Sequence, residues 1–227
     1  MVTLTKDFYL GVYPVTQAQW KHVTGNVLTT QPAYAGPKRP VPTVSTVQVC
    51  GSDHGYPKDK TVAADSFIGL LREKTNVSSF YIPTQAQWEF ACRAGTTTHI
   101  LWGEDPSRIP EFAWCDENSD GRQLHDVGLK LPNPWGLYDM IGLVEELCAN
   151  WWMDFDGTEF VDPEGPEDPP EYGVTPLAPK NSPRRAVCGG CYWREATACR
   201  AAFVSGCAAE GGDYSNGVRV MCDARAY

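Results

Sequence analysis

The sequence has few of the features that mark nucleic-acid-binding proteins, membrane proteins or histidine-based enzymes. Among its 227 residues, 28 acidic side chains outnumber 19 basic ones, which gives a net charge of −9. Nucleic acids and anionic membranes require a basic protein face, so this balance argues against both. The histidines show no spacing typical of metal ligands or of a catalytic triad; they are His22, His54, His99 and His125.

The sequence also lacks long apolar segments. No run approaches the roughly 18 residues of a membrane-spanning helix, and residues 1–7 do not form a secretion signal. As written, the chain is expected to be cytoplasmic and not inserted in a membrane. Its nine cysteines are an odd number, and without a signal segment most are expected to be free thiols.

What the chain does have is a large apolar fraction interrupted by turn-forming residues. Apolar residues make up 42% of it, and it contains 21 glycines and 18 prolines. Such a chain can bury a sizeable core, but loops and turns must hold much of that core together.

A short internal repeat predicts two helices. The residues from Thr16 to Trp20 recur from Thr84 to Trp88, and in both copies a glutamine follows the threonine at the third position. This pattern is the capping box, in which threonine caps the start of a helix. Apolar spacing further predicts a helix over residues 61–74, and the β-branched run at 41–49 predicts a short strand.

Six segments of the chain, taken together, resemble the formylglycine-generating-enzyme (sulfatase-modifying factor) family. They are Tyr13–Gln17, Ile82–Glu89, Arg93–Thr97, Leu131–Trp152, the Gly189–Gly190 pair and the closing Gly217–Val220 segment, in the order of the family. The resemblance implies one domain over residues 1–227. It implies an α+β, C-type-lectin-like fold that is rich in loops, with short antiparallel strands and a few helices.

The resemblance to the enzyme fails at its centre. Catalytic members carry two copper-binding cysteines after the double glycine. In this sequence the second falls on Cys199, but the first falls on Arg194, which cannot supply a thiolate. Copper is therefore not expected, and no catalytic residue is assigned. The alternative is a divergent oxidoreductase that acts on a peptide cysteine or a thiol through Cys199.

Other metals are weakly supported. The calcium ligands that the resemblance leaves are Glu146 and Val144, and one remaining carboxylate makes a poor calcium site because calcium takes six or more oxygens. If no calcium binds, Glu146 is expected to accept hydrogen bonds from main-chain donors of nearby loops. A zinc site is the other possibility, although its spacing is irregular; it would use Cys188, Cys191, Cys199 and Cys207.

The segment from 185 to 222 also resembles the variable segment of the variable proteins of diversity-generating retroelements, many of which use this fold. In those proteins, mutation directed to adenines changes asparagine codons to a limited set of residues. The positions that fit this set are Cys191, Tyr192, Arg194, Thr197, Phe203, Val204, Ser205, Asp213, Tyr214, Ser215 and Asn216. Trp193, Glu195 and Glu210 do not fit this set, because they do not arise from an asparagine codon. They would have to be encoded already in the template copy of the segment.

We therefore expect a non-enzymatic protein that binds an unknown protein or other macromolecule through this segment. Glu195 and Thr197 are expected to be among the residues that contact this ligand. The contacts expected to anchor the ligand, because aromatic and arginine side chains dominate interfaces, are Tyr192, Trp193, Arg194, Phe203 and Tyr214. Two other interpretations stay open. In the first, the protein is an inactive enzyme whose C-terminal segment only packs against the rest of the fold. In the second, it is a structural subunit that assembles with a partner through the acidic stretch at 154–172.

Overall fold

The helices of the chain are short, and so are most of its strands. The computed structural model describes residues 2–51, 60–98, 100, 103, 105–152, 159–165, 184–208 and 214–224. Over these residues no helix is long and apolar enough to cross a membrane. The helices are α1 (Gln17–Thr24), α2 (Thr46–Cys50), α3 (Phe67–Thr75), α4 (Gln85–Arg93) and α5 (Ile109–Phe112), with 3₁₀ turns η1 (Pro106–Arg108) and η2 (Ala196–Ala198).

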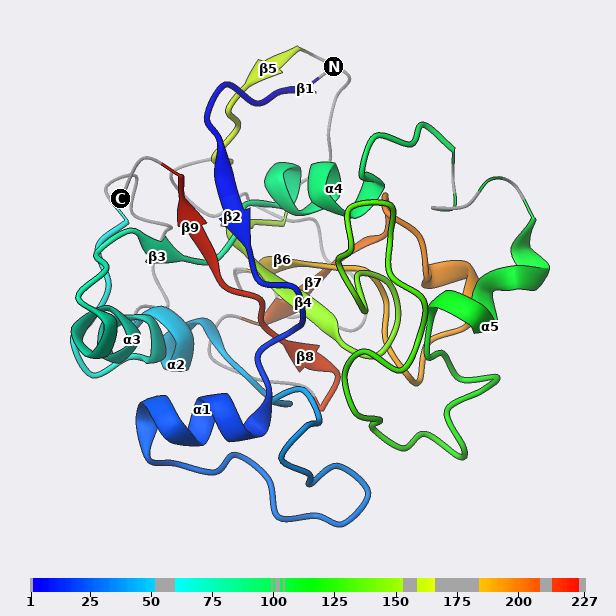
Figure 1. Cartoon of the computed structure of the whole chain (residues 1–227), viewed down its shortest axis with the longest axis horizontal. Helices are drawn as coiled ribbons and strands as arrows, with labels where there is room; N and C mark the ends of the chain where they lie inside the picture. The colour runs from blue at the N-terminus through cyan, green and yellow to red at the C-terminus, as the bar shows by residue number, and fades with distance from the viewer. Residues whose placement is uncertain are drawn as a thin grey trace.

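Over the described residues, the strands form three small sheets. They are β1 (Val2–Thr3), β2 (Phe8–Leu10), β3 (Phe80–Tyr81), β4 (Glu145–Trp151), β5 (Phe160–Val161), β6 (Arg184–Cys188), β7 (Val204–Ala208), β8 (Asn216–Gly217) and β9 (Met221–Asp223). In the four-stranded sheet the order is β7-β6-β4-β8, with β8 parallel to β4. In the three-stranded sheet β9 lies between β2 and β3, so a strand from near the start of the chain pairs with one from near its end (Figure 1).

The capping boxes predicted from the repeat are confirmed. The Thr16 side chain accepts a hydrogen bond from the Gln19 main chain, and the Gln19 side chain bonds back to Thr16. Thr84 and Gln87 make the same pair of bonds at the start of α4. The helix predicted over 61–74 begins later than expected, at Phe67, where Ser66 caps it.

The strand predicted at 41–49 is wrong. The structure has α2 there, and Ser45 and Gln48 form a third capping box at its start. The β-branched valines of this segment pack into the core instead of forming a sheet, and Val41, Val44 and Val49 are buried. The local capping signal therefore outweighs the strand preference of these residues.

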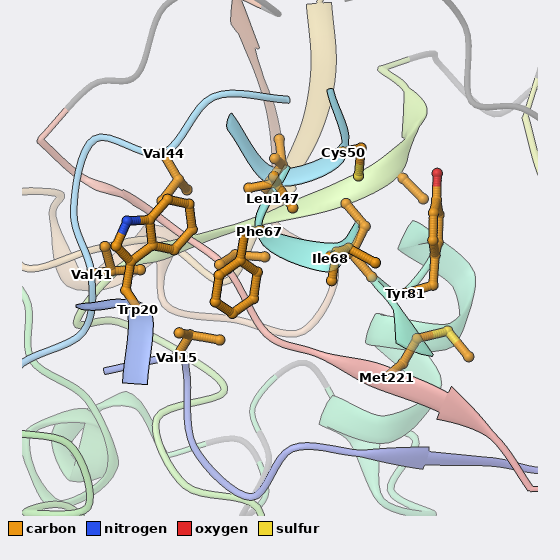
Figure 2. Packing of buried hydrophobic residues seen from close by; sticks show 14 of the residues in the cluster. Val15, Trp20, Val41, Val44, Cys50, Phe67, Ile68, Tyr81, Leu147 and Met221 are labelled. Atoms are coloured by element: carbon orange, nitrogen blue, oxygen red, sulfur yellow. The ribbon is translucent and has the colours of Figure 1, made fainter. Parts of the chain in front are cut away.

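The largest core cluster lies between the four-stranded sheet and the first three helices (Figure 2). The rings of Trp20 on α1 and Phe67 on α3 stack with centroids 4.6 Å apart. Leu147 from β4 and Met221 from β9 reach the same cluster. The two larger sheets and the helices α1–α3 thus share one apolar interior, which supports the loops beyond the ends of β4 and β6.

Two glycines after β6 are required by the backbone. Gly189 and Gly190 have φ angles of 94° and 72°, in the left-handed region that favours glycine. A Cβ on Gly189 would lie 2.7 Å from the Met140 carbonyl oxygen, and one on Gly190 would lie 2.8 Å from that of Ala198. This close turn directs the chain from β6 into the segment that begins at Cys191.

Candidate functional site

One buried carboxylate, Glu145 at the start of β4, connects three separate parts of the C-terminal segment. Arg194 donates from Nε to its Oε1 at 2.9 Å. Ser205 on β7 donates to the same oxygen at 3.1 Å, and Ser215 donates to Oε2 at 3.5 Å. Because the Glu145 side chain is only 4% exposed, water competes little for these bonds, and the three parts are held together.

Arg194 is held from several sides but remains accessible. Its guanidinium carbon lies 4.8 Å from the ring centroid of Trp193 and 5.6 Å from that of Phe203. Both distances are within the range of cation–π attraction. The Arg194 side chain is 33% exposed. The bond to Glu145 therefore fixes a partly exposed cation beside two aromatic rings, a preorganised contact surface.

A second aromatic group adjoins the segment and comes from a loop early in the chain. Tyr34 stacks on Tyr214 with centroids 4.9 Å apart and lies 6.1 Å from Tyr192. The amide of Gln31 donates to the Tyr214 hydroxyl at 2.8 Å. The side chain of Tyr214, which is 40% exposed, is thus oriented by residues that the sequence analysis did not include.

The predicted contact residues divide by burial. Glu195, Thr197 and Tyr214 are exposed, and a second group is partly buried: Trp193, Arg194, Phe203, Val204 and Ser205. A third group was predicted to contact the ligand but is buried in this structure: Cys191, Tyr192, Ser215 and Asn216. Asp213 lies outside the described residues, as does most of the acidic stretch at 154–172.

The residues expected for calcium do not fit a calcium ion. Glu146 accepts hydrogen bonds from Arg219 at 2.6–3.1 Å and from the indole of Trp88 at 2.7 Å. A guanidinium therefore occupies the position beside Glu146 that a cation would need. Over the described residues, no group of three or more His, Cys, Asp or Glu side chains is arranged to hold a metal, including the cysteines considered for zinc.

Cys199 lies against another thiol. The Cys199 and Cys115 side chains hydrogen-bond to each other, and this bond lowers the pKa of Cys115 and raises that of Cys199. Burial raises the pKa of Cys199 further. The thiolate that the alternative oxidoreductase mechanism requires at Cys199 is therefore disfavoured.

The fold and the motifs are matched by known proteins. A model of the family described as the sulfatase-modifying factor enzyme 1-like domain matches residues 1–224. The chain belongs to this family. The solved structure of Treponema denticola variable protein 1 has the same fold, with a TM-score of 0.78 and 23% identity over 98% of this chain and 86% of that one. The loop-rich, C-type-lectin-like fold expected from the resemblance is confirmed.

Two curated relatives of the family match at the sequence level. The chaperone protein LppX of Paenibacillus barcinonensis is 27% identical, and the match covers 66% of this chain and 64% of that protein. The formylglycine-generating enzyme of Thermomonospora curvata is 33% identical, and the match covers 38% of this chain and 34% of that enzyme. The match covers less than two thirds of either relative.

Sequence reasoning missed Glu145, although a signal for it exists. In the family resemblance, Glu145 stands where a tryptophan is usual, and Arg194 stands where a copper-binding cysteine is usual. The two departures introduce opposite charges, and the structure pairs them at 2.9 Å. Reading both departures together would have predicted the contact. No comparable signal marks Tyr34 or Gln31, which lie in an irregular loop.

Proposed function

We propose that this chain is a non-enzymatic ligand-binding protein that presents a contact surface built from its C-terminal segment. The surface consists of Trp193, Arg194, Glu195, Thr197, Phe203, Val204, Ser205 and Tyr214, with Tyr34 beside them. It binds a protein or another macromolecule and needs no resident metal or cofactor. This family thus supplies a scaffold whose former catalytic position serves recognition.

The observation that carries the proposal is the Glu145–Arg194 pair. At the position of the first copper-binding cysteine the chain has a guanidinium, which is bonded at 2.9 Å to a buried carboxylate and flanked by Trp193 and Phe203. This arrangement cannot bind copper through two thiolates. Arginine and aromatic side chains are instead the residues that dominate binding energy at interfaces, and here they lie together and are partly exposed.

We further propose that the segment is diversified, as in variable proteins of diversity-generating retroelements. The likeness in fold to a protein named as a variable protein supports this proposal. The fixed elements support it too, because the double glycine, the buried Cys199 and the buried Arg219 frame the segment without depending on the identity of the exposed side chains.

Replacement of Trp193 by alanine tests the binding surface. The chain is screened against a library of displayed protein domains, and the affinity of the strongest partner is measured by calorimetry. Trp193→Ala is expected to weaken that affinity by about 30-fold or more, equivalent to about 2 kcal/mol, because it removes an aromatic anchor and one ring beside Arg194.

The matched control for this test is Trp135→Ala. Trp135 is 51% exposed and lies outside the C-terminal segment, so its removal should change the affinity less than about twofold, since contacts away from an interface contribute little. Equal affinities of the wild-type chain and Trp193→Ala, with both variants folded, would contradict the proposal.

A further inference from the structure

A mostly apolar pocket lies between α1 and the loop that follows it, over residues 26–39. The loop runs back beneath the helix (Figure 1), and the pocket has a volume of about 520 Å³. Its apolar walls include Ala18 on α1 and Val27, Ala35 and Pro37 on the loop. Binding sites for small molecules have volumes of about 300–1,000 Å³ and mostly apolar walls. The pocket is therefore large enough for a small ligand.

Hydrogen bonds join the two walls of this pocket. The Gln17 side-chain amide donates to the Tyr34 carbonyl at 2.7 Å and accepts a bond from the Gly36 main chain at 3.0 Å. The Ala18 main chain donates to the Pro37 carbonyl at 3.1 Å. The helix and the loop are thus fixed relative to each other. A ligand does not have to order them, which lowers the free-energy cost of binding.

The pocket offers few polar groups to a ligand. The Gln17 amide is already used in its bonds to the loop. The Thr29 hydroxyl accepts a bond from the Gln31 main chain at 3.2 Å, and Pro37 has no main-chain N–H to donate. A sugar or a nucleotide would leave many of its polar groups without partners here, which is costly. The walls therefore favour a ligand with a hydrocarbon body.

Basic side chains stand at the same pocket. Lys21 and His22 line it from the last turn of α1, and both are exposed. No acidic side chain is among the described residues that line the pocket. Within the described part of the chain, Lys21 forms no ion pair. On a chain with a net charge of −9, this is a place where an anion is attracted and not repelled.

We propose that this pocket binds a medium-chain monocarboxylate, a molecule with one carboxylate and an unbranched hydrocarbon chain. The hydrocarbon chain lies against the apolar walls and covers Val27, which is 53% exposed. Burial of this apolar surface supplies most of the affinity. The carboxylate accepts charge-assisted hydrogen bonds from the Lys21 ammonium, which orient the molecule in the pocket. The apolar body and the anionic head of the ligand thus match the two kinds of wall.

The pocket is separate from the proposed contact surface, although one loop contributes to both. Tyr34, which stacks on Tyr214, directly precedes the pocket residue Ala35. The described residues that line the pocket all lie between positions 17 and 37, far in sequence from the C-terminal segment. Binding of a monocarboxylate therefore requires no macromolecular partner, and its test can fail while the proposed function stands.

Titration of the isotope-labelled full-length chain with sodium octanoate, followed by nuclear magnetic resonance, tests the proposal. We expect saturable shifts of the amide signals of Ala18, Val27 and Ala35, with a Kd of about 1 mM for a ligand of this size. Acetate has the charge without the chain, and octylammonium has the chain with the opposite charge. Each should shift these signals with an affinity at least about tenfold weaker.

Three variants make the test specific to this pocket. Lys21→Gln should weaken octanoate binding about fivefold, because it removes an exposed charge contact. Lys38→Gln is the matched control, since Lys38 is an exposed lysine of the same loop that does not line the pocket; it should change the affinity less than about twofold. Ala18→Trp places a large side chain in the pocket and should abolish the shifts. Ala18 is exposed, so this variant is expected to fold, and circular dichroism checks it.

Three results would overturn the proposal. They are the lack of saturable shifts at the pocket at octanoate concentrations about tenfold above the expected Kd, shifts that Ala18→Trp leaves unchanged, and equal weakening by Lys21→Gln and Lys38→Gln. The first can be read from the wild-type chain alone. A chain that binds octanoate in this pocket but binds no macromolecular partner would contradict only the proposed function.

Discussion

Replacement of Arg219 by alanine should lower the free energy of unfolding by about 3–5 kcal/mol, because it leaves a buried carboxylate without its countercharge. Arg219 and Glu146 are both at most 1% exposed and are joined at 2.6 Å. Arg219 also donates to the carbonyl oxygens of Gly11 at 2.7 Å and Tyr138 at 2.8 Å. The variant would therefore lose the charge pair with Glu146 and the bonds to two carbonyl acceptors at separate points of the chain.

Chemical denaturation measures this loss, and two variants make it specific. Arg200→Ala removes an exposed arginine close in the sequence and should change stability by less than about 0.5 kcal/mol. The double variant Arg219→Ala with Glu146→Ala should be more stable than additive losses predict, because neither charge is left alone. A loss from Arg219→Ala no larger than that from Arg200→Ala would show that the pair does not hold the fold.

Replacement of Asp139 by asparagine should stabilise the chain at pH 8 and leave its stability at pH 4 unchanged. Burial is the main cause that raises the pKa of Asp139 from 3.8 to about 6. The residue is 3% exposed, its Oδ1 has no hydrogen-bond partner, and its Oδ2 accepts a bond from the Gly128 main chain at 2.7 Å. The charged groups that act on it are Arg219 and Glu146.

The direction follows from the two protonation states. Because the folded pKa lies above the unfolded value, the protonated side chain is favoured by folding. Its contribution is complete below about pH 4 and is lost as the pH rises through about 6. A shift of about two pKa units corresponds to about 3 kcal/mol. Asparagine is neutral at every pH, so it avoids this loss while keeping an acceptor for Gly128.

Unfolding curves at pH 4 and pH 8 measure the difference, and Asp120→Asn is a matched control. Asp120 has nearly the same left-handed backbone, with φ of 52° against 55° at Asp139, but its side chain is 75% exposed. Its substitution should change stability by less than about 0.5 kcal/mol at both pH values. An effect of Asp139→Asn that is equal at the two pH values would mean that the buried charge is not its cause.

Local signals predicted the parts of the fold that local interactions determine. Thr16 and Thr84 start helices because each side chain caps its own first turn, and this bond depends on residues three apart. The strand prediction at 41–49 is wrong because it follows the strand preference of the valines, while Ser45 and Gln48 form a capping box that starts a helix. Where the two signals disagreed, the hydrogen-bonded cap decided the local structure.

The candidate site was predicted less well because its contacts join distant parts of the chain. Arg194 was recognised as a departure from the family, but its partner Glu145 lies 49 residues away. Tyr34 reaches Tyr214 from a loop whose sequence carries no signal of that contact. Tyr192 was expected on the surface as an aromatic anchor, yet it packs into a small cluster with Leu124. Burial of a single aromatic residue depends on tertiary packing, which no local pattern gives.

Deep sequencing of the gene in a growing population tests most directly the central claim that this segment is a diversified binding surface. Codons 185–227 are compared with a control window over codons 81–140. We predict substitutions concentrated at surface positions such as Arg194, Phe203 and Tyr214, while the codons for Gly189 and Arg219 stay constant. A C-terminal segment as invariant as the control window would contradict the account.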